Sequence, residues 1–434
     1  MKIHRCCTSL LALAAVFALG ACDLDLVDPN LPPEEQVISD PEGIRRLAIG
    51  LQAEWGNELV DPVYVVGLVT DEIGAGSATF DSYKNVDAGV EIDNNLDPSE
   101  GPWAAMYDVV QVANLLIDNA PDVPLETATR SGIIALARLF KAMAFGNLLQ
   151  IFERIPLAPG PDNTQPEFAS RAEAVQAVLT LLDEARAQIQ QTPPSSDFDT
   201  QILAPGFDLA NTIEAMDARF SLMFGDEARA MAAAQNVDPD VLSEFRFTAT
   251  DPNPLWVLWY ASGNAFQMRP EDRFRLDAEP GDERVDYWVT PADIAGAHGP
   301  LDHHTKYFIR DASFPAYLPD EMKLIRAEIH ARQGNLAAAI ALINEVRTQC
   351  SSVLDEPVAC LPPYVPLLPT QQQVLDQILY EREYELYLQA VRWSDLRRFG
   401  EPVKYEFMMV PRSECDRNAN APTDICQLST PPAS

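Results

Sequence analysis

Cys22 is the residue of this 434-residue chain whose type and setting point most directly to a covalent chemistry. It follows Leu19-Gly20-Ala21, which has the small residues of a cleavage site, at the end of the apolar run Leu10–Leu19. A basic start, a short apolar run and a small-residue site are typical of a secretory signal peptide. A cysteine directly after Gly-Ala is typical of a lipoprotein signal, because its thiol receives diacylglycerol. We therefore expect residues 1–21 to be removed and Cys22 to be lipidated.

The residues after this cysteine are acidic and rich in proline, which is typical of an extended linker. We assign residues 22–40 to a lipidated tether. Asp23, Asp25 and Asp28 in this segment resemble the surface-export signals of lipoproteins in Bacteroidota-like bacteria, and they fit a simple solvated linker equally well.

Four cysteines remain in the mature chain, namely Cys350, Cys360, Cys415 and Cys426. An even number of cysteines in an exported protein predicts disulfides. Pairing each cysteine with its neighbour in sequence is the simplest of the three possible connectivities. A zinc site is the alternative, but the chain has no CxxC motif and no histidine near these cysteines.

Catalytic motifs are missing from the sequence. It contains no G-x-S-x-G, no H-E-x-x-H and no glycine-rich loop suited to phosphate. His298, His303 and His304 lack partners at a ligand spacing, so we expect loop residues there. We predict no catalytic residue, no metal site and no cofactor. A carboxylate pair for glycoside hydrolysis stays open as an alternative, because acidic residues are plentiful and none is singled out.

Aromatic residues in irregular segments are the candidate binding residues. Sugars present apolar C–H faces, on which aromatic rings stack, and hydroxyls, which polar side chains bond. The predicted ligand contacts are Tyr83, Trp256, Trp259, Tyr260 and Trp288. Core packing beneath long loops is the alternative for each of them. Trp103 and Trp393 lie on apolar helix stripes, and we assign both to the core.

Net charge limits the possible partners. The formal net charge of −34 disfavours nucleic acids and anionic membrane faces. The hydrophobic content of 47% is ample for a large core. No long linker divides the chain, so residues 41–434 are expected to form a single domain.

The segment Asp320–Cys350 predicts two helices joined by a tight turn. Apolar residues recur at helical spacing in both halves. Gly334 can take the left-handed conformation that ends a helix, and Asn335 can cap the next one. This pattern is typical of a tetratricopeptide hairpin, which cannot bury its apolar face alone and so needs other helices stacked on it.

Further helices are expected on both sides of that hairpin. A capping box at Ser170 and Glu173 marks the start of one, and Gly225 separates two others. Val63–Thr70 is either a helix or a buried strand, and Asp71–Asn95 is expected to be a long loop. The helices predicted outside the hairpin are Pro41–Glu58, Trp103–Asn119, Thr129–Phe152, Ser170–Gln191, two within Leu209–Asn236, and one long helix over Thr370–Gly400.

The predicted fold is mostly α, a tetratricopeptide-like helical-repeat scaffold with a loop-rich, variable ligand-binding face. Proline, glycine and aspartate recur over residues 238–319, which we expect to form loops, short helices and a few short strands. Residues 320–400 form the C-terminal helical core. Its last helix is densely charged, and we predict that these charges form a structural salt-bridge network.

The stretch YEREYELYLQAVRWSDLRRFG resembles the C-terminal signature of the SusD/RagB family. Other matches follow the family's order, including a W-x-x-x-Y helix at Trp103 and Tyr107 and the hairpin around Gly334-Asn335. Gln389-Ala390-Val391 departs from the usual stretch. The signature positions are occupied by Glu381, Arg382, Glu385, Leu386, Arg392, Trp393, Asp395, Leu396, Arg398 and Gly400.

This resemblance implies a non-enzymatic lipoprotein of the outer membrane that faces the exterior. Such proteins cover a TonB-dependent SusC-like transporter and capture oligosaccharides or related nutrients for it. Two rival hypotheses remain. A helical-repeat scaffold for outer-membrane assembly would bind no small ligand, and a lipid-anchored glycosidase would turn over a glycan.

Overall fold

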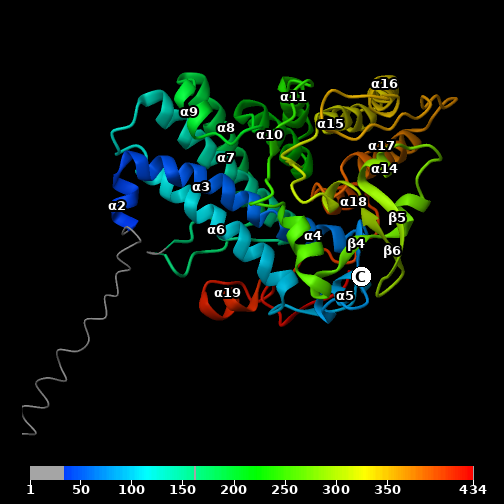
Figure 1. Cartoon of the computed structure of the whole chain (residues 1–434), viewed down its shortest axis with the longest axis horizontal. Helices are drawn as coiled ribbons and strands as arrows, with labels where there is room; N and C mark the ends of the chain where they lie inside the picture. The colour runs from blue at the N-terminus through cyan, green and yellow to red at the C-terminus, as the bar shows by residue number, and fades with distance from the viewer. Residues whose placement is uncertain (1–33, 161–162, 434) are drawn as a thin grey trace, which may run out of the picture.

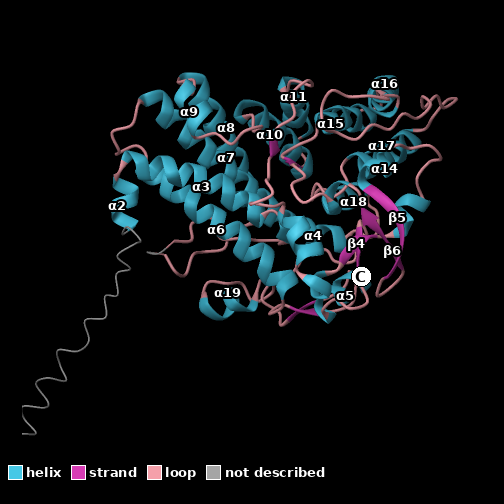
Figure 2. Ribbon diagram, viewed as in Figure 1, coloured by secondary structure: helices cyan, strands magenta, loops and turns pink. Residues whose placement is uncertain are grey.

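Helices dominate the computed structural model, which describes residues 34–160 and 163–433 (Figures 1 and 2). The predicted signal peptide (1–21), Cys22 and residues 23–33 lie outside the described residues. The last part of the predicted tether is helical: α2 (Glu34–Ser39) contacts α3 and α6.

The N-terminal half is a layer of long helices. α3 starts at Asp40, whose carboxylate accepts a hydrogen bond from the Gly43 N–H at 3.0 Å. α6 packs on α3 and α7, and α7 packs on α8. These helices are α3 (Pro41–Glu58), α4 (Val60–Val69), α6 (Asp97–Asn119), α7 (Thr127–Ile151) and α8 (Arg171–Gln191).

α7 is the one helix of the described chain that is long and apolar enough to cross a membrane by composition. Most of its apolar window, 83%, is buried inside the protein. Its neighbours α6 and α8 cover it, so the sequence of α7 reflects a central core helix.

Helix pairs continue the array toward the C-terminus. α8 contacts α10, α11 contacts α15, and α17 packs on the α15–α16 hairpin, so consecutive pairs stack along one direction (Figure 1). This arrangement confirms the predicted tetratricopeptide-like scaffold. The helices are α9 (Ser196–Gln201), α10 (Leu209–Phe224), α11 (Glu227–Asn236), α15 (Pro319–Arg332), α16 (Leu336–Arg347), α17 (Gln371–Glu385), α18 (Arg392–Phe399) and α19 (Arg412–Arg417).

Turn chemistry follows the sequence in most places. The capping box at Ser170 is present, and Gly225 and Gly334 have positive φ values of 91° and 80°. Asn335 occupies the N-cap position of α16, but its side chain makes no capping hydrogen bond, contrary to prediction.

Short elements fill residues 238–319, as expected. They include two short helices, α13 (Asp272–Leu276) and α14 (Arg284–Trp288). The described residues form four antiparallel two-stranded sheets, of which three join distant parts of the chain and the fourth, β5 with β6, is a local pairing. They pair β1 (Ile73–Ala75) with β4 (Met268–Pro270), β2 (Ile92–Asp93) with β8 (Ser429–Thr430), β3 (Glu244–Phe245) with β7 (Phe314–Pro315), and β5 (Val289–Ala295) with β6 (Pro300–His304).

The prediction of a long loop over Asp71–Asn95 is wrong. This segment contains β1, α5 (Asp81–Ala88) and β2. Both strands are only two or three residues long, and their partners lie far away in sequence. Tertiary pairing therefore creates these strands, and local sequence periodicity carries little signal for them.

The single helix predicted for Thr370–Gly400 is also wrong, because the chain breaks between α17 and α18. Leu388 and Ala390 have positive φ values of 57° and 54° within the break. Glu72 holds the break in place: its Oε1 accepts a hydrogen bond from the Leu388 N–H at 2.9 Å. The Tyr387 hydroxyl donates to the backbone oxygen of Glu72 at 3.2 Å.

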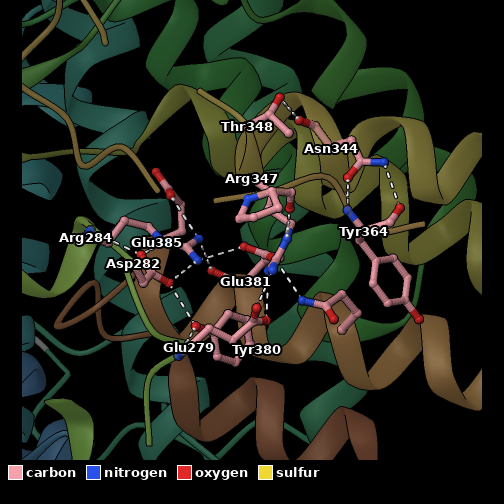
Figure 3. A network of polar contacts seen from close by, with 12 residues as sticks. Glu279, Asp282, Arg284, Asn344, Arg347, Thr348, Tyr364, Tyr380, Glu381 and Glu385 are labelled. Carbon is pink, nitrogen blue, oxygen red and sulfur yellow. Dashed lines mark hydrogen bonds and ion pairs between the residues drawn. The ribbon is translucent and has the colours of Figure 1, made fainter. Parts of the chain in front are cut away.

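Buried ion pairs hold the middle segment against the C-terminal helices (Figure 3). The Arg284 side chain is fully buried and lies 2.7 Å from Asp282 Oδ2 and 2.8 Å from Glu381 Oε2. Arg347 of α16 reaches Glu381 from another side at 3.0 Å. Arg382 and Asp395 form a further buried pair, at 2.7 Å, across the break. The predicted structural salt-bridge network is confirmed.

Replacing Arg284 with methionine is expected to lower the free energy of unfolding by about 3–5 kcal/mol, because buried carboxylates would lose their shared cation. Urea unfolding at pH 7 measures the change. The control is Arg46→Met, which breaks a solvent-exposed pair with Glu42 on α3 and should cost less than about 0.5 kcal/mol. Equal losses in the two variants would contradict the structural role of the network.

Glu72 predicts a pH dependence of stability. Burial raises the pKa of the Glu72 carboxyl to about 7 in the folded protein. The folded state therefore holds this proton more tightly than the unfolded chain does. Stability from the neutral form is present below about pH 4.5 and is lost as pH rises toward 7.

The Glu72→Gln variant lacks this titration. Relative to it, the wild-type protein is expected to lose about 3 kcal/mol of unfolding free energy between pH 4.5 and pH 8. Urea titrations of both proteins at several pH values measure this difference, and the other carboxyls cancel in the comparison. Parallel curves would show that Glu72 is charged throughout.

Candidate ligand-binding site

A π-helical turn at Val257–Ala261 brings aromatic side chains to the surface of the middle segment. It follows α12 (Pro254–Trp256), which starts at Asn253. The Asn253 side chain accepts a hydrogen bond from the Leu255 N–H at 2.8 Å and donates one to the Ala312 backbone oxygen at 2.7 Å. π-helical turns are rare and are frequent at functional sites.

The exposed face here, which we call the aromatic platform, joins this turn to residues 308–309. Phe308 and Ile309 are exposed, with 57% and 54% of their residue surface accessible. The Tyr260 ring meets the Phe308 ring edge-on, with centroids 4.9 Å apart. The platform comprises Trp256, Val257, Tyr260, Phe308 and Ile309.

Two arginines hold the rings of the platform. The Arg310 guanidinium lies 5.2 Å from the Trp256 ring centre, and that of Arg269 lies 4.0 Å from the Tyr260 ring centre. Such cation–π contacts favour one ring orientation. Each arginine therefore lies over one face of its ring and helps to hold that ring in a fixed geometry.

A buried layer supports the platform from below. The Trp259 ring stacks on the His304 ring with centroids 4.5 Å apart. The Tyr260 hydroxyl lies 3.1 Å from His304 Nδ1 and accepts the His304 backbone N–H at 3.2 Å. Burial lowers the pKa of His304 well below its usual range, so its ring is neutral at physiological pH.

A polar groove of about 500 Å³ adjoins the platform at Ile309. On one wall, Lys306 Nζ donates to Asp355 Oδ2 at 2.9 Å and to the Tyr287 hydroxyl. The groove therefore offers both hydrogen-bond donors and acceptors beside an apolar surface. Its lining residues are Glu244, Arg246, Phe247, Tyr287, Thr305, Lys306, Ile309, Asp311, Ala312, Ser313 and Asp355.

A second groove, of about 460 Å³, lies between α6 and α19. Trp103 at its base is a core residue, as predicted, with 6% of its surface exposed. Glu100, Asp108 and Glu414 place carboxylates along it. It lacks a broad exposed ring face, so it is the weaker candidate for stacking a neutral sugar.

The structure separates the five predicted ligand contacts into two groups. Trp256 and Tyr260 reach the surface, whereas Tyr83, Trp259 and Trp288 are buried. The Tyr83 hydroxyl donates to Asp97, and Trp288 Nε1 donates to the Tyr384 backbone oxygen at 2.9 Å. These three rings pack in the interior because helices and short strands cover segments that the sequence predicts as loops.

Phe308 and Ile309 were missed by the sequence analysis. They follow Tyr307, a buried residue, within a short apolar run. The run has no periodic pattern of apolar and polar residues from which buried and exposed positions could be told apart. Their exposure depends on how residues 306–310 meet the π-helical turn.

Both short disulfide loops are present, joining Cys350 to Cys360 and Cys415 to Cys426. The first loop contains Asp355, the residue that bonds Lys306 in the polar groove. This disulfide therefore restrains one wall of the candidate site.

One group of carboxylates in the described part of the chain is close enough to hold a metal ion: Asp71, Asp87 and Glu271. Protein cations already occupy its surroundings. Arg273 pairs with Asp71 at 2.9 Å, and Lys404 pairs with Asp71 on the other side. Burial raises the pKa of Glu271 to about 7, which further reduces the negative charge. We therefore assign these three carboxylates to an ion-pair cluster and not to a metal site.

The aromatic platform lies on a tetratricopeptide-like helical array. Residues 320–431 match the model of the SusD family. Most of the chain also shares the fold of solved SusD-like structures. SusD-like carbohydrate-binding proteins form a non-catalytic family, and the match over residues 320–431 agrees with the prediction that this chain is not an enzyme.

Solved structures share the fold at low sequence identity. A SusD-like carbohydrate binding protein from Bacteroides vulgatus is 16% identical, with a TM-score of 0.66 over 83% of this chain and 84% of its own. A laminarin binding SusD-like protein is 16% identical, with a TM-score of 0.66 over 92% and 100%. A SusD homolog from Bacteroides thetaiotaomicron is 14% identical, with a TM-score of 0.67 over 92% and 99%. A search of curated protein sequences finds no match.

The two tryptophans of the turn are expected to respond differently to truncation. Trp259→Ala should lower the free energy of unfolding by about 3–5 kcal/mol, because it leaves a cavity beside His304. Trp256→Ala should cost no more than about 1 kcal/mol, because its ring is partly exposed. Urea unfolding measures both. A cost for Trp256→Ala as large as that for Trp259→Ala would contradict the assignment of Trp256 to the surface.

Proposed function

We propose that this protein captures an oligosaccharide or related nutrient at the cell surface. The aromatic platform is the observation that carries this proposal. Its rings offer flat apolar surface for the C–H faces of sugars, and the groove beside it offers Lys306, Asp311 and Ser313 for hydroxyls. Trp256 and Tyr260 are the proposed stacking residues, with Phe308 beside them.

The family and the sequence pattern support a matching location. Residues 1–21 act as a lipoprotein signal, Cys22 carries the lipid, and residues 22–40 tether a single domain of residues 41–434. The mature protein is anchored in the outer membrane and faces the exterior. It delivers its ligand to a TonB-dependent SusC-like transporter, as the SusD/RagB resemblance implies. The negative net charge suits a soluble surface protein with a neutral ligand.

A related protein supports the ligand class. The laminarin binding SusD-like protein shares the fold over most of both chains. That protein binds laminarin, and the platform here offers exposed aromatic rings of the kind that stack on sugars. Laminarin is therefore a sensible first probe in a panel of neutral glycans.

Trp256→Ala and Tyr260→Ala are each expected to weaken binding of the best glycan by roughly tenfold to a hundredfold, because each removes a stacking ring. Isothermal titration calorimetry on the lipid-free mature protein measures the affinity. Leu367→Ala is the matched control, since it truncates an apolar residue that is 93% exposed and belongs neither to the platform nor to the groove lining.

The outcomes separate the proposal from its rivals. An outer-membrane assembly scaffold would bind no glycan in the panel, with or without these rings. A glycosidase would shorten the glycan during the titration, which chromatography of the recovered sugar would detect. Unchanged affinity in both ring variants would place the ligand elsewhere on the molecule.

A further inference from the structure

Arginines and aromatic rings alternate in a stack on the side of α18 that faces α10. The Arg171 guanidinium lies 5.9 Å from the Phe224 ring centre and 4.8 Å from that of Phe407. The Arg397 guanidinium also lies over the Phe407 ring, 4.6 Å from its centre, and it lies 4.8 Å from the Trp393 ring centre. We call these five residues the arginine ladder. It joins the start of α8, the end of α10 and α18 through one ring.

The two arginines of the ladder have no carboxylate partner among the described residues. Arg171 Nη1 donates to the Leu149 backbone oxygen at 2.9 Å. Arg397 donates to the backbone oxygens of Glu406, at 2.7 Å, and Gln150. The side-chain carboxylates of Glu153 and Glu406 act only at longer range. Most other arginines of this acidic chain sit in ion pairs, so the ladder is unusual within it.

Like charges are therefore held together with little water around them. Burial, followed by repulsion from Arg171, lowers the pKa of Arg397 to about 9. Burial likewise lowers the pKa of Arg171. Rings and carbonyls offset part of this cost, but neither supplies a full negative charge. An anion beside the ladder would relieve the electrostatic deficit.

A pocket of about 310 Å³ opens beside the ladder and can hold such an anion. Nε and Nη2 of Arg171 and Nε of Arg397 make no hydrogen bond with the described part of the chain, so donors remain for a ligand. Arg398 also lines the pocket, but Glu328 and Asp395 neutralise it. The lining residues are Gln150, Arg171, Leu222, Met223, Phe224, Gly225, Ser394, Arg397, Arg398 and Phe407.

We infer that this pocket is an anion site that binds a sulfate or carboxylate group through Arg171 and Arg397. Planar guanidinium groups bond such oxyanions through paired N–H donors. The pocket is built from residues other than those of the platform and its groove, so it is a separate site from the proposed neutral-glycan surface. The group it takes is either a free small anion or the acidic substituent of a sugar.

The test uses inorganic sulfate and galacturonate at low millimolar concentration with the mature, lipid-free protein. Chloride at matched ionic strength and galactose are the reference ligands. Calorimetry and thermal shift should both report binding of the two anions and no equivalent effect of chloride or galactose at this site. Oligogalacturonate tests the second source: tighter binding than sulfate identifies an acidic glycan, and equal or weaker binding identifies a free anion.

Arg171→Gln and Arg397→Gln are each expected to weaken anion binding about tenfold or more. Arg417→Gln is the control, because Arg417 is exposed and equally free of an ion pair among the described residues. Arg171→Lys keeps the charge but loses the planar fork, and it should also bind more weakly. This variant retains the test if Arg397→Gln does not fold.

Absence of sulfate and galacturonate binding to the wild-type protein would overturn the inference. So would an equal loss in Arg417→Gln, which would mean that only the general charge matters. Trp256→Ala is expected to keep full anion binding. The two proposals therefore fail separately. Loss of the glycan-capture proposal would not change the measured anion binding, and absence of anion binding would not change the measured glycan affinity.

Discussion

The Arg284 guanidinium is fully buried, and it is surrounded by carboxylates from its own turn and from α17. The placement of the neighbouring elements depends on these ion pairs. Arg284 starts α14, which leads directly into β5 and β6 and thus fixes where the loop-rich segment meets the helices. Glu381 is shared with Arg347, so the same carboxylate ties α16 and α17 together. Because buried pairs are costly when incomplete, the network favours one mutual placement of these elements over alternatives.

The candidate ligand site is a consequence of that placement. The helical array supplies a rigid base, while the short elements of residues 238–319 supply the side chains that face outward. His304 and Trp259 form the boundary between the two layers: they are fully buried, and Tyr260, which bonds His304, stands at the surface above them. Adjacent residues in one π-helical turn thus perform opposite tasks. The buried layer restricts the motion of the exposed rings. This restriction lowers the entropic cost of ordering the rings when a ligand binds.

The sequence predicted the long helices well, because their apolar periodicity and caps are local properties. It failed where structure depends on distant partners. Asp71–Asn95 carries strands that exist only because β4 and β8 pair with them, and the break after Glu385 depends on Glu72, which is more than three hundred positions away. The candidate site was predicted in part. Aromatic content pointed to the segment that carries the platform, but burial decides which rings are exposed, and burial follows from the packing of the whole chain. Trp256 and Tyr260 are partly exposed, whereas Tyr83, Trp259 and Trp288 are covered.

The pairing of β2 with β8 bears on the order in which the chain can fold. Asn94, next to β2, donates to the backbone oxygen of Val410, a residue 316 positions later, and β8 lies within the last few residues of the chain. The β2–β8 contact closes a loop of more than three hundred residues, and long-range closure of this kind forms slowly. The region around β2 therefore reaches its final structure only after segments that are far apart in sequence have met.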